Sequence, residues 1–192
     1  MDDTTTMMRA ALAAGDTARG HASPNPWVGA VVVSPLGEIV ATGATEPPGG
    51  RHAEIVALDA AGPTAEGCTL VCTLEPCSHH GRTPPCVDSI IGAGIERVVI
   101  GVVDPDDQDA GRGIEALRRA GVGVEVGVLA EEVSAQLEPY LHHRLTGRPY
   151  VLCKLAMTLD GGIAAVDGSS RWITGDEARH DAHRLRAQSD AI

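Results

Sequence analysis

Residues 68–92 read CTLVCTLEPCSHHGRTPPCVDSIIG, and this stretch decides the fold. Its first part, from Cys68 to Leu74, is apolar and rich in β-branched residues, which predicts a buried strand. Cys77 follows that strand, and Cys86 opens a segment whose apolar residues recur at helical spacing. The stretch therefore predicts a strand, a loop and a helix, with one thiol at each end of the loop.

His52 and Glu54 precede this stretch and are separated by one alanine at the start of a predicted helix. One imidazole and two thiolates, from His52, Cys77 and Cys86, are three zinc ligands. Three protein ligands leave the fourth tetrahedral position to water, which is the pattern of a catalytic zinc. Glu54 can share the rim of this site without binding the metal. It is therefore the candidate residue that carries protons to and from the water.

The alternative reading of these residues is a closed, structural zinc site. In that case the fourth ligand would come from the loop, as His79 or His80. A closed site would hold no water for Glu54 to act on, so a catalytic zinc site is favoured.

The other segments of residues 1–146 alternate between helix and strand. The sequence predicts a helix at 6–19, a hairpin of strands at 27–33 and 38–42, helices at 52–61, 86–92, 113–120 and 130–145, and strands at 68–74, 97–103 and 122–128. This order predicts a three-layer α/β/α domain with a mixed, mostly parallel sheet. The zinc ligands would lie at the ends of elements on one sheet edge, where α/β proteins commonly place sites.

Residues 147–192 read as the beginning of a second unit. Strands are predicted at 150–157 and 163–166, and a helix at 174–186 that begins with a good N-cap at Thr174. This segment is much shorter than the usual independent domain of about 100 residues. We therefore expect 1–146 to form one domain and 147–192 to be the truncated start of another α/β domain.

Composition limits the classes of partner. The chain has 15 basic and 26 acidic residues, a net charge of −11, and no basic run suited to a phosphate backbone. A nucleic-acid partner is therefore disfavoured. No apolar run reaches the roughly 20 residues needed to cross a bilayer, and the N-terminus does not resemble a signal peptide. A cytoplasmic protein without a membrane partner is the expectation.

Cysteine usage argues against a disulfide framework. The count of five is odd, and two cysteines belong to the zinc pattern. Cys68, Cys72 and Cys153 lie in apolar segments of β type. We expect all three to be small buried side chains.

At this point the motifs closely resemble one family, the bifunctional riboflavin-biosynthesis deaminase/reductases. The deaminase half is matched by Asn25-Pro26, His52-Ala53-Glu54, residues 73–86 and Ala93-Gly94-Ile95, and the reductase half by Lys154, Leu159-Asp160-Gly161, residues 168–174 and Leu185-Arg186-Ala187. Eight residues separate Cys77 from Cys86, whereas the short zinc-deaminase signature has two. The resemblance implies a cytidine deaminase-like domain followed by the start of a dihydrofolate reductase-like domain.

The implied reaction is removal of an amino group from 2,5-diamino-6-ribosylamino-4(3H)-pyrimidinone 5′-phosphate, with release of ammonia. One Zn²⁺ per chain, held by His52, Cys77 and Cys86, would lower the pKa of its water towards about 7. Glu54 would take the proton from that water and return it to the departing nitrogen.

The resemblance also implies substrate contacts. Asn25 would hydrogen-bond the pyrimidine, and His79 and Arg82 would reach the substrate and its ribose phosphate. The alternatives are an ordinary turn residue at Asn25 and ordinary polar loop residues at His79 and Arg82. A homo-oligomer, dimeric or tetrameric, is a further expectation from the family.

For the reductase half, the resemblance implies nicotinamide contacts at Ala156 and Trp172 and substrate contacts at Ser170 and Arg186. NADPH would be the cofactor of the full-length reductase, and we expect no reductase activity from this chain. The deaminase half departs from the family at two places. Thr45 stands where a histidine is frequent, and residues 104–107 read Asp-Pro-Asp-Asp instead of Asp-Pro-Asn-Pro. The first departure could weaken a substrate contact.

Two other functions remain open from the sequence. One is deamination of a different nucleobase or nucleoside, which equal turnover of a substrate without phosphate would favour. The other is a non-catalytic zinc-binding module, which a zinc-loaded but inert protein would favour.

Overall fold

The computed structural model describes residues 3–80 and 84–192. The chain divides into two compact units, Met1–Tyr150 and Val151–Ile192, each of which is described by itself. The first unit contains every strand of the described chain and six of its seven α-helices.

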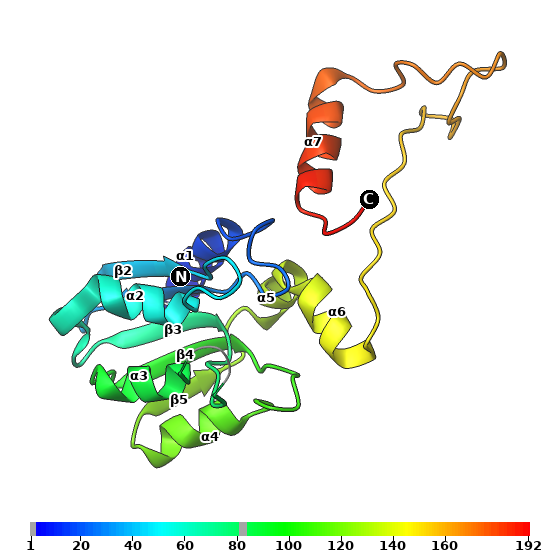
Figure 1. Ribbon diagram of the computed structural model, residues 1–192. Coiled ribbons are helices and arrows are strands. Elements are labelled where there is room, and N and C mark those ends of the chain that lie inside the picture. The colour runs from blue at the N-terminus through cyan, green and yellow to red at the C-terminus, as the bar shows by residue number, and fades with distance from the viewer. Residues whose placement is uncertain (1–2, 81–83) are drawn as a thin grey trace. The chain divides into compact units, whose positions relative to one another are not determined.

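A five-stranded sheet forms the centre of the first unit, in the order β2-β1-β3-β4-β5 (Figure 1). The strands are β1 (Gly29–Val33), β2 (Ile39–Ala44), β3 (Thr69–Leu74), β4 (Arg97–Val102) and β5 (Gly123–Val126). Strand β1 is antiparallel to both β2 and β3, whereas β3, β4 and β5 are parallel to one another. The predicted hairpin and the mixed sheet with a parallel later half are therefore confirmed.

Helices cover both faces of the sheet (Figure 1). They are α1 (Asp3–Asp16), α2 (Ala53–Ala61), α3 (Cys86–Gly92), α4 (Arg112–Arg119), α5 (Ala130–Gln136) and α6 (Glu138–Thr146), with a short 3₁₀ helix at Gly62–Ala65. On one face, α1 packs against β1 and β3 and contacts α5. On the other, α2 packs against β1 and β2 and contacts α3, which in turn contacts α4. The predicted three layers are present.

The core lies along the central strands. Val31 in β1, Val71 in β3 and Val99 in β4 are aligned across the sheet and are at most 1% exposed. Strands covered on both faces are apolar along their whole length instead of alternating, which explains why these segments read as continuous apolar runs. Without phenylalanine in the chain, branched aliphatic side chains fill this space.

The start of α2 packs directly against the backbone of β2. A Cβ added at Gly43 would lie 2.2 Å from the carbonyl oxygen of Ala53, so only glycine fits there without displacing the helix. This close approach fixes the position of His52, the residue that precedes α2.

The predicted single helix at 130–145 is wrong, because the structure has two helices there. Leu137 lies between α5 and α6 with φ −91° and ψ 9°, and Pro139 is in the first turn of α6. Proline cannot donate a backbone hydrogen bond and clashes with the carbonyl four residues earlier, so it ends one helix but suits the start of the next.

The second unit, Val151–Ile192, contains one regular element, α7 (Asp176–Ala187). The predicted helix is confirmed, but its N-cap is Gly175 and not Thr174 as predicted. The strands predicted at 150–157 and 163–166 are wrong. A strand needs a neighbouring strand to satisfy its backbone groups, and the side chains here are exposed, 80% for Val151 and 62% for Leu155. Cys153 is also exposed, against expectation, whereas Cys68 and Cys72 are buried as predicted.

Candidate metal centre

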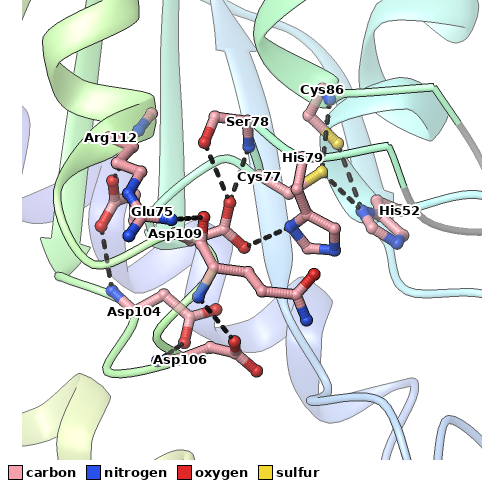
Figure 2. Close-up of polar contacts among 12 residues, drawn as sticks. His52, Glu75, Cys77, Ser78, His79, Cys86, Asp104, Asp106, Asp109 and Arg112 are labelled. Carbon is pink, nitrogen blue, oxygen red and sulfur yellow. Dashed lines mark hydrogen bonds and ion pairs between the residues drawn. The ribbon is translucent and has the colours of Figure 1, made fainter.

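Three side chains from separate elements meet beside the end of β3 (Figure 2). His52 precedes α2, Cys77 follows β3, and Cys86 is the first residue of α3. The Nδ1 atom of His52 is 3.5 Å from Sγ of Cys77 and 3.3 Å from Sγ of Cys86. All the possible ligand atoms lie within 4.8 Å of one another. The residues predicted from the motif as zinc ligands are thus brought together.

The residues at the start of α3 are hydrogen-bonded to Cys77. The backbone N–H of Cys86 donates to Sγ of Cys77 at 3.3 Å, and the N–H of Val87 donates to the carbonyl of Cys77 at 3.2 Å. The first N–H groups of a helix have no partner within it and favour a nearby negative charge. The start of α3 therefore supports a thiolate at Cys77.

Contacts within this group shift the pKa values of its members. Hydrogen bonds with Cys86 and His52 lower the pKa of Cys77 to about 4. The contact with Cys77 also raises the pKa of Cys86, with burial acting in the same direction. The hydrogen bond with Cys77 raises the pKa of His52 to about 9. These shifts favour a thiolate at Cys77 beside a protonated imidazole at His52.

The donor set fits zinc. A tetrahedral Zn²⁺ with ordinary bond lengths holds a sulfur and a nitrogen ligand roughly 3.6 Å apart. The separations of 3.5 and 3.3 Å between His52 and the two sulfurs are close to that value. Among the described residues, no fourth ligand atom joins the group. Neither ring nitrogen of His79 or His80 lies with this group, so the described residues do not form a closed site.

Zinc binding should release protons, because the metal competes with them for the same atoms. At pH 6–8, His52 and Cys86 carry protons and Cys77 does not. We therefore expect release of about two protons and an affinity that falls by roughly a hundredfold per pH unit as the pH is lowered. Calorimetry in two buffers of different ionisation enthalpy measures the protons. An affinity independent of pH would contradict this assignment of the charges.

Glu54 lies in the first turn of α2 and is 4% exposed. Burial raises its pKa to about 7, although the positive charge of His52 acts in the opposite direction. A carboxyl group with a pKa near neutrality can both accept and return a proton. The structure thus places a buried acid–base group two residues from a candidate ligand, as the motif suggested.

Glu75 was part of the motif, but sequence analysis assigned it no role. Its carboxylate is 3% exposed and accepts four backbone hydrogen bonds. Oε2 accepts from the N–H groups of Asp104 (3.2 Å) and Gly111 (3.0 Å), and Oε1 from those of Gly113 (3.0 Å) and Ile114 (3.2 Å). This carboxylate ties the segment 104–114 and the start of α4 to the residue two positions before Cys77. Its only sequence signal was an acidic residue at the end of an apolar strand.

Asp109 was missed entirely by the sequence analysis. Its carboxylate accepts hydrogen bonds from the backbone N–H of Ser78 at 2.7 Å, from the Ser78 hydroxyl at 3.2 Å and from Nδ1 of His79 at 2.9 Å (Figure 2). Asp109 is 30 residues from His79, so no local pattern could have connected them. The first residues of the cysteine loop are therefore anchored by the segment that follows β4.

The departure at residues 104–107 is accommodated by local contacts. Asp104 is buried and accepts hydrogen bonds from the Tyr140 hydroxyl at 3.0 Å and from the N–H of Asp106 at 2.9 Å. Burial raises the pKa of Asp104. Asp106 lies 3.3 Å from the guanidinium of Arg144 in α6. These carboxylates thus connect the segment after β4 to α6.

Asn25, Thr45 and Arg82 were also singled out from the sequence. Asn25 is half-buried in the loop before β1. Thr45 is buried, and its hydroxyl accepts a hydrogen bond from the N–H of Val28 at 3.1 Å, so it is engaged with the backbone. Arg82 lies outside the described residues.

The residues assigned to the reductase half meet in the second unit. Ala156, Ser170, Trp172 and Arg186 line one open hollow of about 300 Å³. The guanidinium of Arg179 stacks on the Trp172 ring at 4.4 Å from its centroid. Ser170 and Trp172 come from the loop before α7, and Arg186 comes from α7 itself.

Within residues 3–80 and 84–192, no helix combines the length and the apolar character needed to cross a bilayer.

Two family models match this chain. Residues 1–102 match the cytidine and deoxycytidylate deaminase zinc-binding region, and residues 149–192 match the RibD C-terminal domain. Together they cover both segments from which the family resemblance was drawn.

Known proteins give the same result. The chain is 48% identical to riboflavin biosynthesis protein RibD of Aquifex aeolicus, over 96% of this chain and 52% of that protein. It is 51% identical to RibD of Mycobacterium tuberculosis H37Rv, over 91% of this chain and 51% of that protein. The chain thus spans about half the length of the curated relatives it matches.

A solved structure supports the fold. The crystal structure of a diaminohydroxyphosphoribosylaminopyrimidine deaminase/5-amino-6-(5-phosphoribosylamino)uracil reductase from Thermotoga maritima superposes with a TM-score of 0.90 at 44% identity. The match covers 96% of this chain and 53% of that one. The resemblance inferred from the motifs and the cytidine deaminase-like fold are therefore confirmed.

Proposed function

Because the chain belongs to the family of zinc-binding cytidine and deoxycytidylate deaminases, we propose that it catalyses a zinc-dependent hydrolytic deamination in riboflavin biosynthesis. The substrate is 2,5-diamino-6-ribosylamino-4(3H)-pyrimidinone 5′-phosphate, and the products are 5-amino-6-ribosylamino-2,4(1H,3H)-pyrimidinedione 5′-phosphate and ammonia. The observation that carries the proposal is the three-donor group of His52, Cys77 and Cys86 beside the buried carboxyl group of Glu54.

His52, Cys77 and Cys86 would hold the zinc. When bound, Zn²⁺ supplies a Lewis acid that makes a water molecule acidic enough to act as a nucleophile near neutral pH. Glu54 accepts a proton as the nucleophile forms and later donates it to the nitrogen that leaves as ammonia. Its burial and its pKa of about 7 suit both steps, because neither protonation state is strongly disfavoured at neutral pH.

The substrate class rests on the relatives. Deaminases of this pathway act on a pyrimidine that carries a ribose phosphate, which the name of the Thermotoga protein states. We assign Asn25 to the pyrimidine, and His79 and Arg82 to contacts with the substrate and its ribose phosphate. A single phosphate needs only one or two donors, which is compatible with a net charge of −11.

The two halves of the chain have separate roles in this proposal. Residues 1–146 form the deaminase domain, and residues 147–192 belong to a reductase domain. The hollow lined by Ala156, Ser170, Trp172 and Arg186 supports this division, because a nicotinamide contact and a substrate contact need to be adjacent. NADPH is the proposed cofactor of the complete reductase. A homo-oligomer and a cytoplasmic location stay predictions.

Ammonia release from the diaminopyrimidine ribose phosphate by the zinc-loaded protein tests the proposal. We expect turnover with this substrate and much less with cytidine, deoxycytidylate or guanine. A zinc-loaded, folded protein that releases no ammonia from any of them would support a non-catalytic zinc module. Better turnover of another base would reassign the substrate within the same chemistry.

Replacing Arg82 with Ala should raise KM for the phosphorylated substrate by about tenfold, because a charge-assisted contact to phosphate is removed. The same change should leave KM for the dephosphorylated substrate nearly unaltered. Steady-state kinetics with both substrates measure the difference. Arg119→Ala, on the exposed face of α4, is the matched control. Equal effects of Arg82→Ala on both substrates would remove Arg82 from the phosphate site.

A further inference from the structure

The contact between Asp109 and His79 is built into the fold. The Asp109 side chain is 3% exposed, whereas that of His79 is 34% exposed. Oδ2 of Asp109 accepts from Nδ1 of His79 at 2.9 Å, and Oδ1 accepts from the N–H of Ser78 at 2.7 Å. A buried carboxylate thus holds one edge of an imidazole whose other parts reach solvent.

The backbone N–H and carbonyl of Asp109 are both hydrogen-bonded. The Asp109 backbone donates to the carbonyl of Asp106 at 2.9 Å and accepts from the N–H of Arg112 at 2.6 Å. Glu75 holds the neighbouring Gly111 and Gly113 through their N–H groups. Because Glu75 is two residues before Cys77, the same network sets the position of Asp109 relative to the candidate metal ligands.

The chemistry of the pair determines which ring nitrogen carries the proton. An ionised carboxylate only accepts hydrogen bonds, so Nδ1 of His79 must be the donor. In a neutral imidazole the other nitrogen, Nε2, then has a free lone pair and can only accept. Histidines that bind metals commonly donate one ring N–H to a carboxylate, which fixes the tautomer and the orientation of the ring.

We propose that Asp109 is a positioning residue that fixes His79 as its Nδ1–H tautomer and presents Nε2 to the substrate as a hydrogen-bond acceptor. His79 then recognises a donor on the substrate, a ring amino group or a ribose hydroxyl. It does not recognise the phosphate, whose oxygens are acceptors. This inference rests on the proposed function for the identity of the ligand, but the tautomer does not depend on it.

Asp109→Asn should change the tautomer of His79 while keeping nearly the same side-chain shape at residue 109. The amide oxygen of asparagine can still accept from the N–H of Ser78, which leaves its NH₂ group facing Nδ1 of His79. Nδ1 must then accept, and the proton moves to Nε2. We expect ¹⁵N NMR of ring-labelled protein, recorded at mildly alkaline pH and assigned with His79→Gln, to report Nδ1–H in the parent and Nε2–H in Asp109→Asn.

In steady-state kinetics, the same variant should change KM much more than kcat. We expect Asp109→Asn to raise KM by about tenfold with a much smaller change in kcat, because a binding contact is reversed while Glu54 and the zinc ligands are untouched. Asp107→Asn, an exposed change of the same charge in the same loop, is the matched control for both readouts. Zinc content and thermal unfolding verify that each variant is folded.

The outcomes are distinguishable. An Nε2–H tautomer in the parent protein would overturn the positioning role without any variant. A flipped tautomer in Asp109→Asn with unchanged KM would show that Nε2 does not receive a substrate donor, and would also overturn the proposal. If the parent protein releases no ammonia, the proposed function fails, and the NMR result still decides the role of Asp109.

Discussion

Glu54→Gln is expected to lower kcat by about 10²–10⁴-fold while zinc stays bound. Glutamine has nearly the same shape as glutamate and leaves His52, Cys77 and Cys86 unchanged, but it cannot accept and return a proton. Because Glu54 is 4% exposed and its pKa is about 7, solvent cannot easily replace it as the proton carrier. Ammonia release and zinc content, measured on the same preparation, check this expectation.

The control for this experiment is Glu131→Gln, which changes the same group at an exposed position of α5. It should behave like the parent protein. Glu54→Gln that retains more than half of the parent kcat would contradict the assignment of Glu54. Loss of zinc from the variant would instead point to a role for Glu54 in holding the ligands in place.

Glu75→Gln is expected to lower the free energy of unfolding by about 2–4 kcal/mol. The parent carboxylate accepts four backbone hydrogen bonds in a site that is 3% exposed. Glutamine keeps one acceptor oxygen and turns an NH₂ group towards N–H groups that also need an acceptor. Buried donors without a partner cost more than the hydrogen bonds themselves contribute.

Urea unfolding measures this change, with Glu115→Gln on the exposed side of α4 as control. The control should change stability by no more than about 0.5 kcal/mol. We further expect Glu75→Gln to weaken zinc binding, because Glu75 is two residues before Cys77. Stability within about 0.5 kcal/mol of the parent would show that the segment 104–114 does not need this anchor.

The group formed by His52, Cys77 and Cys86, with Glu54 beside it, could be expected from the sequence because these residues lie in short motifs with chemically restrictive residue types. Strands β3 and β4 could be predicted because a strand buried on both faces is a continuous apolar run. The break in the helix predicted at 130–145 coincides with Pro139, a residue that suits the first turn of a helix but not its interior. The strands predicted in 150–166 failed because apolar content indicates a strand only where a partner strand exists.

The roles of Glu75 and Asp109 could not be predicted from the sequence. Each carboxylate is stabilised by groups about 30 residues away or more, and the register of β3 beside β4 decides which groups those are. Asp109 reads locally as one of several acidic residues in a turn. Only its burial and its three hydrogen-bond donors separate it from an exposed neighbour such as Asp107.

The sequence by itself determined the chemistry of this protein: an imidazole, two thiols and a carboxyl group whose spacing is typical of a zinc deaminase. It also determined the order of layers, because apolar periodicity is a local property of the chain. The tertiary structure decided which charges are buried and what holds them. Burial and hydrogen bonding depend on contacts between segments distant in sequence, and these contacts form only when the parallel strands β3 and β4 bring the segments after them to the same edge of the sheet.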